Sequence, residues 1–384
     1  MNNFNLLPSF KNRQEILDYL DNFSPTKYEA TRNYLSGQVS HLSPYITAGV
    51  ISLNQIRYQL LSKNSLKDCH KIIQELAWRD FFASVKLAKG EAIFADLRQP
   101  QANQVSQKMP KAILEGKTGI VSLDSAINKL YQVGYLHNHE RMWLASVVCN
   151  IAGTSWLTGA KWMYYHLLDG DAASNMLSWQ WVAGTFSPKK YFANQENINK
   201  YTTGYASPAN LSNLQSQFKT FLDFSYEQLE QNAEDTVIPE ILRDRSELIF
   251  PDSSGKAKPH WSDLSIPEKR IFKGINDNNS SQIIRVCTDS TITFPDNSFD
   301  EENNQALNII FIDSQNWEKL PFGQNRLNFI LSPGQHQIFY GTKIELEKLI
   351  NRQFDIPVQE RMFPQLTDYY PSFFKFWSKA EKLI

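Results

Sequence analysis

The sequence predicts a mainly α-helical protein that ends in a small α/β module. From about residue 12 to residue 187 the apolar residues recur at the three- and four-residue spacing of amphipathic helices. Beyond residue 307, short apolar runs lie between turn-forming residues, which is typical of strands. We therefore expect a helical domain over residues 1–205, a linker with a local helix over residues 206–280 and a small α/β module over residues 281–384.

The predicted helices are separated by glycine and proline, which end helices more readily than they continue them. These residues fall at positions 44, 49, 100, 110, 116 and 119, between the apolar runs. The runs with helical spacing cover residues 14–23, 52–61, 69–90, 122–134, 139–153 and 161–171.

The C-terminal part of the chain has a different composition. Residues 203–280 are rich in Ser, Pro, Asn and Gly, which indicates a linker. Residues 308–313, 327–332 and 337–341 are short apolar runs that we expect to form strands. Residues 343–354 have the pattern of a helix.

Composition narrows the class of protein. No apolar stretch is long enough to cross a membrane, and the N-terminus lacks the charged-then-apolar pattern of a secretion signal. We expect a cytoplasmic, monomeric protein with no membrane partner. The three cysteines are too few and too far apart for a disulfide framework or a zinc site. His137 and His139 do not share a helix face, so we expect no metal there.

Charge is divided unevenly along the chain. Residues 1–205 hold 21 Lys and Arg against 15 Asp and Glu, whereas residues 206–384 hold 18 against 25. A polyanion such as nucleic acid would therefore bind the first half.

One predicted helix carries an unusual stripe. Glu75, Trp78, Arg79 and Phe82 are spaced so that they share one face of the helix. A structural interpretation pairs Glu75 with Arg79 beside two buried rings. A functional interpretation gains support because similar chemistry recurs at residues 137–142 and 179–181.

The segment 169–181 raises a similar choice. Trp179 and Trp181 are two residues apart, so they point to opposite sides and only one can be buried. An outward tryptophan is a stacking platform for a base. Asp169 and Asp171 flank Gly170 and could also cap a helix after a turn.

Five segments in collinear order resemble the FAD-binding helical domain of the photolyase and cryptochrome family. The resemblance extends over roughly residues 26–200, about half of the chain. The matching segments are 28–52, 74–82, 115–119, 134–146 and 167–181.

The resemblance implies FAD as the cofactor, folded into a U shape inside a helical bundle. Arg141 and Asp169 would form a buried ion pair beside the flavin, Asp171 would bind the adenosine end, and Asn175 would lie at flavin N5. The positions that the resemblance assigns to cofactor binding are Tyr28, Ser40, Leu42, Ser43, Arg141, Asp169, Gly170, Asp171 and Asn175.

The resemblance also implies an enzyme, a blue-light DNA photolyase. Such an enzyme transfers an electron from excited reduced flavin to a pyrimidine dimer that is flipped out of DNA and splits it. Glu75 and Asn138 match polar contacts to the dimer, Trp78 and Trp181 its stacking walls, and Met142 an apolar contact. Further DNA contacts would come from Arg32, Arg79, His139, Lys189 and Lys190.

Three departures from the family pattern shape the expectations. Few residues precede Tyr28, where the family usually has an α/β antenna-binding domain, so we expect that domain to be lacking and the antenna chromophore stays open. The C-terminal module could be its reduced counterpart. Trp179 and Trp156 match two members of an electron relay, but the third falls near Asn103, which leaves the route of flavin photoreduction open.

The third departure is His139, which stands where enzymes for cyclobutane dimers usually have arginine. A histidine there predicts pH-sensitive dimer binding and resembles the acid histidines of six-four photolyases. Asn138 and the two pocket tryptophans favour the cyclobutane dimer. An alternative function is a cryptochrome-like blue-light photoreceptor, in which the acidic C-terminal half contacts a signalling partner.

Overall fold

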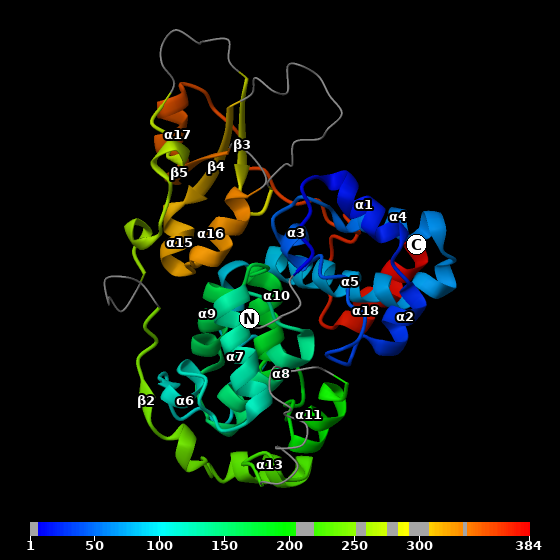
Figure 1. Cartoon of the computed structure of the whole chain (residues 1–384), viewed down its shortest axis with the longest axis vertical. Coiled ribbons are helices and arrows are strands. Elements are labelled where there is room, and N and C mark those ends of the chain that lie inside the picture. The colour runs from blue at the N-terminus through cyan, green and yellow to red at the C-terminus, as the bar shows by residue number, and fades with distance from the viewer. Residues whose placement is uncertain (1–6, 205–218, 251–258, 275–282, 292–306, 333–335) are drawn as a thin grey trace.

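The computed structural model describes residues 7–204, 219–250, 259–274, 283–291, 307–332 and 336–384. It is mainly helical, with a small parallel sheet in the C-terminal part, as the sequence predicts. In Figure 1 the helical body fills the lower and right-hand parts of the view, and the sheet lies above it. Within the described residues, no helix is both long and apolar enough to cross a membrane.

The first helices wrap around α5, a 24-residue helix that begins after its cap Ser65 and ends at Gly90. Its apolar residues recur at helical spacing on more than one side, so it packs against several neighbours. The N-terminal helices are α1 (Arg13–Asp21), α2 (Pro25–Thr31), α3 (Ser43–Thr47), α4 (Leu53–Lys63) and α5 (Leu66–Lys89).

The centre of the body is a group of helices in which α8, α9 and α10 pack on one another. A π-helical turn, Val147–Ile151, continues α8. The helices of this part are α6 (Lys111–Leu114), α7 (Val121–Val133), α8 (Asn138–Ser146), α9 (Trp156–His166), α10 (Ala172–Ala183), α11 (Gln195–Thr202) and α13 (Tyr226–Glu234). Two short strands, β1 (Met109–Pro110) and β2 (Arg245–Ser246), pair antiparallel beside them.

The sheet of the α/β part has three parallel strands in the order β3-β4-β5. Its strands are β3 (Ile284–Thr288), β4 (Leu307–Asp313) and β5 (Gln337–Gly341), and its helices are α15 (Ser314–Lys319), α16 (Gln324–Leu331) and α17 (Lys343–Ile350). The predicted strands at 308–313 and 337–341 and the predicted helix after them are confirmed.

The predicted strand at residues 327–332 is wrong, because this segment belongs to α16. Leu327, Ile330 and Leu331 are buried at positions i, i+3 and i+4, which is a helical pattern that six residues are too short to distinguish from a strand. Strand β3 was not predicted; its five residues, Ile284–Thr288, include Arg285 and Thr288 and form an edge of the sheet.

The two faces of the sheet belong to different clusters of buried side chains. Ile310, Ile312 and Ile338 join the main core, which is continuous with the helical body. Ile309 and Phe311 belong to a smaller cluster with residues of α17. Helix α16 therefore lies on the side of the sheet toward the body, whereas α17 covers its outer face (Figure 1).

The chain returns to the helical body at its C-terminal end. Helix α18 (Phe373–Ala380) packs on α5. Ahead of it, the buried carboxylate of Asp80 accepts hydrogen bonds from Arg361 Nη2 at 2.9 Å and from the Met362 amide at 2.8 Å. These contacts tie residues 359–384, which we call the C-terminal strap, to the back of α5.

The three cysteines are all buried, and none forms a disulfide. Burial raises the pKa of the Cys69 thiol to about 11 and that of Cys287 to about 12. Burial also raises the pKa of Cys149 well above its ordinary value.

Candidate functional site

The helices α5, α8, α9 and α10 enclose a cavity of about 420 Å³, a size that is ordinary for small-molecule and cofactor sites. Many of the residues that the sequence singled out line this one cavity, although they come from distant parts of the chain. The predicted residues in its lining are Ser43, Glu75, Trp78, Arg79, Asn138, Arg141, Met142, Asp169, Asp171, Asn175, Trp179 and Trp181.

An ion pair with a buried carboxylate forms one wall of the cavity. We call this pair, together with the start of α10, the floor. Arg141 Nη2 lies 2.7 Å from Asp169 Oδ2, and the Asp169 side chain is only 3% exposed. The hydroxyl of Ser43 donates to the same carboxylate oxygen at 2.5 Å. Burial alone would lower the pKa of Arg141, but the charge and hydrogen bond of Asp169 outweigh it and raise that pKa.

Helix α10 begins at the floor. The Asp171 side chain caps it and accepts a hydrogen bond from the Ser174 amide at 2.7 Å, so the helix-cap interpretation is confirmed. Burial alone would raise the pKa of Asp171, but Arg79 and the Ser174 hydrogen bonds outweigh burial and lower it. One turn on, the buried Asn175 donates its amide to the Ala160 carbonyl at 2.9 Å.

One polar atom at the floor lacks a partner among the described residues. Asp169 Oδ1 is buried and makes no hydrogen bond there. A buried polar group without a partner is costly, so this oxygen favours a bound molecule that donates a hydrogen bond. Flavin and its ribityl chain carry such donors, and the floor therefore fits the expected cofactor.

The opposite end of the cavity, which we call the mouth, is aromatic and partly open. Trp181 is 38% exposed whereas Trp179 is 2% exposed, which is the division that their spacing predicts. The Trp78 ring stacks on Phe373 of the C-terminal strap, with ring centroids 3.8 Å apart and planes at 10°. One face of Trp78 is thus covered, and the residue lines the cavity from a fixed position.

The pair between Glu75 and Arg79 that the structural interpretation requires does not form. Glu75 instead lies 2.8 Å from Lys71 and 3.2 Å from Arg32. Arg79 donates to the Thr47 hydroxyl at 2.8 Å. Thr47 in turn donates to the Asp169 backbone carbonyl at 3.1 Å, which links the stripe on α5 to the floor. Lys71, one helical turn earlier, and Arg32, at the end of α2, thus take the place of Arg79 beside Glu75.

Several predicted residues lie outside the cavity lining. Leu42 is a fully buried core residue. Tyr28 lies in α2, Arg32 directly follows that helix, and Ser40 lies in the segment before α3. Burial is the main cause that raises the pKa of Tyr28. Gly170 contributes its backbone carbonyl, which accepts a hydrogen bond from Arg326.

His139 also lies outside the lining and packs against the ring of Tyr201 at 4.4 Å between centroids. Burial, with smaller contributions from the charges of His137 and Arg32, lowers its pKa to about 4. The side chain is therefore neutral at neutral pH. The pH-sensitive dimer binding that the sequence predicts would then be expected near pH 4, below the neutral range.

Residues 72–207 match the family model described as the FAD binding domain of DNA photolyase. The chain is 34% identical over 161 residues to a deoxyribodipyrimidine photo-lyase of Streptomyces griseus, over 41% of this chain and 35% of that protein. It is 30% identical over 252 residues to a chloroplastic/mitochondrial cryptochrome DASH of Ostreococcus tauri, over 63% of this chain and 44% of that protein.

Residues 72–207 of this chain thus carry the FAD-binding domain found in the photolyase/cryptochrome family. The chain spans between about a third and a half of the length of these curated relatives. A solved Synechocystis cryptochrome superposes with a TM-score of 0.47 at 21% identity, over 61% of this chain and 58% of that chain. FAD is the cofactor that the matched domain of the photolyase/cryptochrome family binds.

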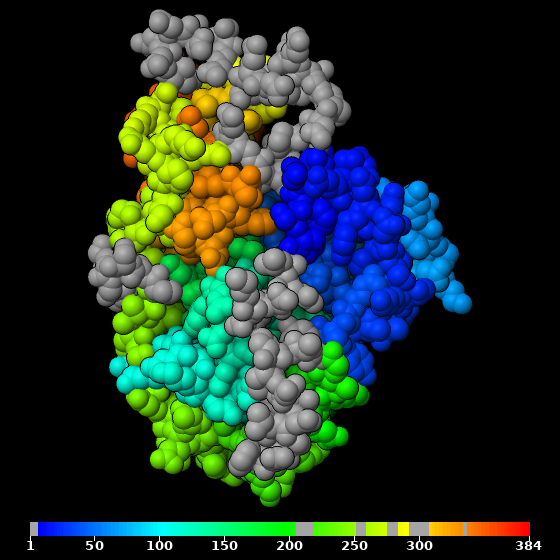
Figure 2. Space-filling model, in the orientation of Figure 1, coloured from blue at the N-terminus to red at the C-terminus, as the bar shows by residue number. Residues whose placement is uncertain are grey.

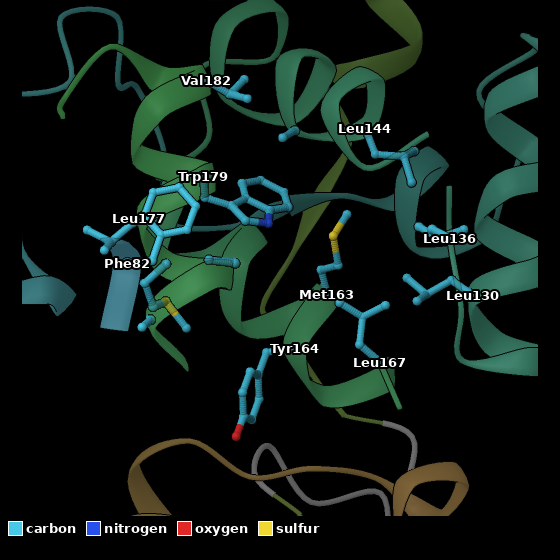
Figure 3. Close-up of a cluster of buried hydrophobic side chains, with 14 of the residues drawn as sticks. Phe82, Leu130, Leu136, Leu144, Met163, Tyr164, Leu167, Leu177, Trp179 and Val182 are labelled. Carbon is cyan, nitrogen blue, oxygen red and sulfur yellow. The ribbon is translucent and has the colours of Figure 1, made fainter. Parts of the chain in front are cut away.

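Trp179 and Trp156, the two tryptophans expected to relay electrons, are both buried. Figure 3 shows Trp179 in the middle of a cluster of apolar side chains. Gly159 makes room for it, because a side chain there would overlap the Trp179 ring. Trp156 donates its indole N–H to Asp96 at 2.6 Å. Asn103, at the expected third position, is buried and donates to the Cys149 and Asn150 carbonyls, so its role in this structure is structural.

Three residues that contact the site were missed by the sequence analysis. Thr47 connects Arg79 to the floor, Phe373 supports Trp78, and Arg326 binds the Gly170 carbonyl. Phe373 lies more than a hundred positions from Trp78, and Arg326 more than a hundred from Gly170, and no local spacing indicates such contacts. Of these three residues, only Phe373 lies in a segment with a recognisable sequence pattern, the aromatic run at residues 369–377.

Proposed function

We propose that this protein is a FAD-dependent blue-light DNA photolyase that repairs pyrimidine dimers, with the cyclobutane dimer as its preferred substrate. The observation that carries the proposal is the single cavity that joins the floor to the mouth. A cofactor held at the floor would lie directly below any base that enters through the mouth. The photo-lyase relative of Streptomyces griseus supports the same activity.

The floor residues would hold FAD. When bound and reduced, FAD supplies the light-excited electron that splits the dimer. The Arg141–Asp169 pair fixes a charged group under the cavity, and the Asp169 oxygen without a partner can accept a hydrogen bond. Because Asn175 holds its amide on the Ala160 carbonyl, its own carbonyl oxygen is oriented as an acceptor. The buried surroundings keep water away from these groups and strengthen their interactions.

The mouth residues would hold the flipped dimer. A dimer leaves the DNA stack only if the protein replaces the lost stacking, and Trp78 and Trp181 offer flat surfaces for this. Asn138 is exposed at the start of α8 and can hydrogen-bond to base edges. Glu75, held by Lys71 and Arg32, is an acceptor for a base N–H.

The preference for cyclobutane dimers rests on what surrounds the cavity. A six-four photolyase needs a histidine that donates a proton to the lesion, but His139 lies outside the lining and is neutral at neutral pH. The apolar and amide groups of the mouth need no such acid. The DNA backbone would contact the basic first half, including Lys189 and Lys190. We further propose a monomer that works in the cytoplasm.

The test is repair of an oligonucleotide with one cyclobutane thymine dimer, using protein whose flavin is chemically reduced beforehand. Light-dependent repair, absent in the dark, is the expected result. Repair of an oligonucleotide with a six-four photoproduct alone would keep the photolyase activity and contradict the proposed substrate. If flavin-loaded, reduced protein repairs neither lesion, the proposal is wrong.

A cryptochrome-like photoreceptor is the second candidate. The C-terminal strap supports it, because Phe373 of the strap stacks directly on the cavity residue Trp78. A change at the flavin could then reach the acidic C-terminal half through this ring pair. Illumination should, on this alternative, change amide hydrogen exchange in α18. Equal exchange in light and dark would leave repair as the only supported function.

A further inference from the structure

Among the contacts between the α/β part and the helical body is one turn at the start of α16, which lies closest to the floor of the cavity. The Gly323 amide donates to the Tyr165 carbonyl at 2.8 Å. The Asn325 side chain donates to the Tyr131 carbonyl at 3.0 Å. Arg326 Nη1 donates to the Gly170 carbonyl at 2.5 Å. In Figure 2 the orange atoms of this region lie directly on the green and cyan helices of the body.

Arg326 is unusual among these donors because it is a charged group that is almost completely buried. Its side chain is 3% exposed, and its second nitrogen, Nη2, lies 2.6 Å from Asp289 Oδ2 at the end of β3. The guanidinium also lies over the rings of Phe322 and Tyr164, at 5.0 Å and 5.5 Å from their centroids. A buried guanidinium is tolerated only when its hydrogen bonds are satisfied, so its position is well defined.

The carbonyl that Arg326 binds belongs to the floor of the cavity. Gly170 stands between Asp169, which pairs with Arg141, and Asp171, which caps α10. The peptide has little room to move, because a side chain at Gly170 would meet both Arg326 and the Tyr164 carbonyl at 3.1 Å. One rigid peptide therefore sets the direction of two carboxylates that line the cavity.

We propose that Arg326 is a positioning residue for FAD, and that the α/β part tightens FAD binding by fixing the Gly170 peptide. This inference rests on the proposed function. Arg326 does not line the cavity and acts only through Gly170. Because binding effects are reciprocal, bound FAD must in turn stabilise the docked position of α16.

The first test compares variants of the full-length protein by titrating the apoprotein with FAD. Arg326→Met removes both charged hydrogen bonds at nearly the same volume, and we expect the FAD dissociation constant to rise about tenfold. The visible circular dichroism of the bound flavin should also change, because the floor carboxylates reorient. Arg326→Lys keeps a cation that can reach one partner and should restore part of the affinity.

The matched control is Asn325→Ala, one residue earlier on the same turn. Asn325 binds the Tyr131 carbonyl, which lies outside the floor, so this variant weakens docking without touching Gly170. Its FAD dissociation constant should stay within about twofold of the wild-type value. Equal losses in the Asn325 and Arg326 variants would overturn the inference, because docking in general, not the Gly170 contact, would then govern affinity.

A second measurement uses only the wild-type protein, so it decides the matter even if Arg326→Met does not fold. Amide hydrogen exchange is compared with and without FAD in α16 and in α17, which covers the outer face of the sheet. We expect FAD to slow exchange in α16 more than in α17. FAD binding without added protection of α16 would overturn this inference alone. A wild-type protein that binds no FAD would overturn both this inference and the proposed function.

Discussion

The floor and the mouth of the cavity are built in opposite ways. At the floor, Asp169 is 3% exposed and its carboxylate is held by Arg141 and Ser43. At the mouth, Trp181 is 38% exposed, and Asn138 is exposed. Buried hydrogen bonds hold the groups of the floor in one arrangement, whereas exposed side chains at the mouth can adjust. The protein thus combines a rigid site for a permanently held group with an adaptable entrance for a large ligand.

The largest effect is expected at the floor, from Asp169→Ala. This variant leaves the partly buried Arg141 without its nearest counter-charge, so we expect a loss of about 3 kcal/mol in the free energy of unfolding. FAD content should fall with it, and both quantities can be measured, by urea unfolding and by flavin absorbance per protein. Asp169→Asn removes the same charge but keeps the size and one acceptor, so it should lose less of both. A full complement of flavin in Asp169→Ala would show that the floor does not hold the cofactor.

An effect of similar size on stability, but with no loss of flavin, is expected behind the mouth, from Phe373→Ala. The ring is 3% exposed and stacks on Trp78, so its removal should cost about 3 kcal/mol of stability without removing flavin. Binding of dimer-containing DNA should weaken as well, because Trp78 loses its support. Phe374→Ala is the control, since Phe374 is 73% exposed and its loss should change stability by less than about 0.5 kcal/mol. If both variants bind DNA equally, the strap does not position Trp78.

Trp181→Ala tests the mouth itself. Because Trp181 is partly exposed, we expect little change in stability and none in flavin content. Affinity for a dimer-containing oligonucleotide should fall by about 1–3 kcal/mol, the value of one base stacked on one aromatic ring. Fluorescence anisotropy of the labelled oligonucleotide measures this. Loss of flavin in this variant would show that Trp181 is needed for cofactor binding, so that the floor and the mouth would not be separate sites.

The smallest effect is expected from protonation of His139. Its pKa is lowered to about 4 from 6.5, so the unfolded chain binds a proton that the folded chain does not. Stability is therefore full above about pH 6.5 and falls as the pH drops toward 4, by at most about 1 kcal/mol for this partly exposed group at pH 5.5. His139→Asn should flatten this part of the pH profile of urea unfolding. Dimer affinity should be the same at pH 6 and pH 8. A steep change between these values would indicate that His139 contacts the dimer at the mouth.

Much of the helical body could be predicted from the sequence, because the residue spacing that indicates each helix lies within a short segment of the chain. The stripe on α5 and the division between Trp179 and Trp181 follow from helical spacing alone. Short apolar segments are ambiguous, and residues 327–332 were therefore assigned to a strand when they form a helix. The structural interpretation, which paired Glu75 with Arg79, does not hold, because Arg32 reaches Glu75 from the end of another helix.

The part of the site that the sequence does not predict depends on contacts between distant segments. Neither the stacking of Phe373 on Trp78 nor the bond from Arg326 to Gly170 has a signature in the neighbouring residues. Such contacts appear only once the C-terminal part of the chain is placed on the helical body. The resemblance to a known domain does not supply them either, since it ends near residue 200.

The buried cysteines make this protein a convenient host for chemical labels. All three thiols are enclosed, and their raised pKa values keep them in the unreactive protonated form at neutral pH. A single cysteine placed at an exposed position would then be the one thiol that reacts readily. In Phe374→Cys the attached fluorophore would stand on α18, at the outer side of the strap. Its emission could follow, in real time and in a chain with no other substitution, whether light moves the C-terminal helix.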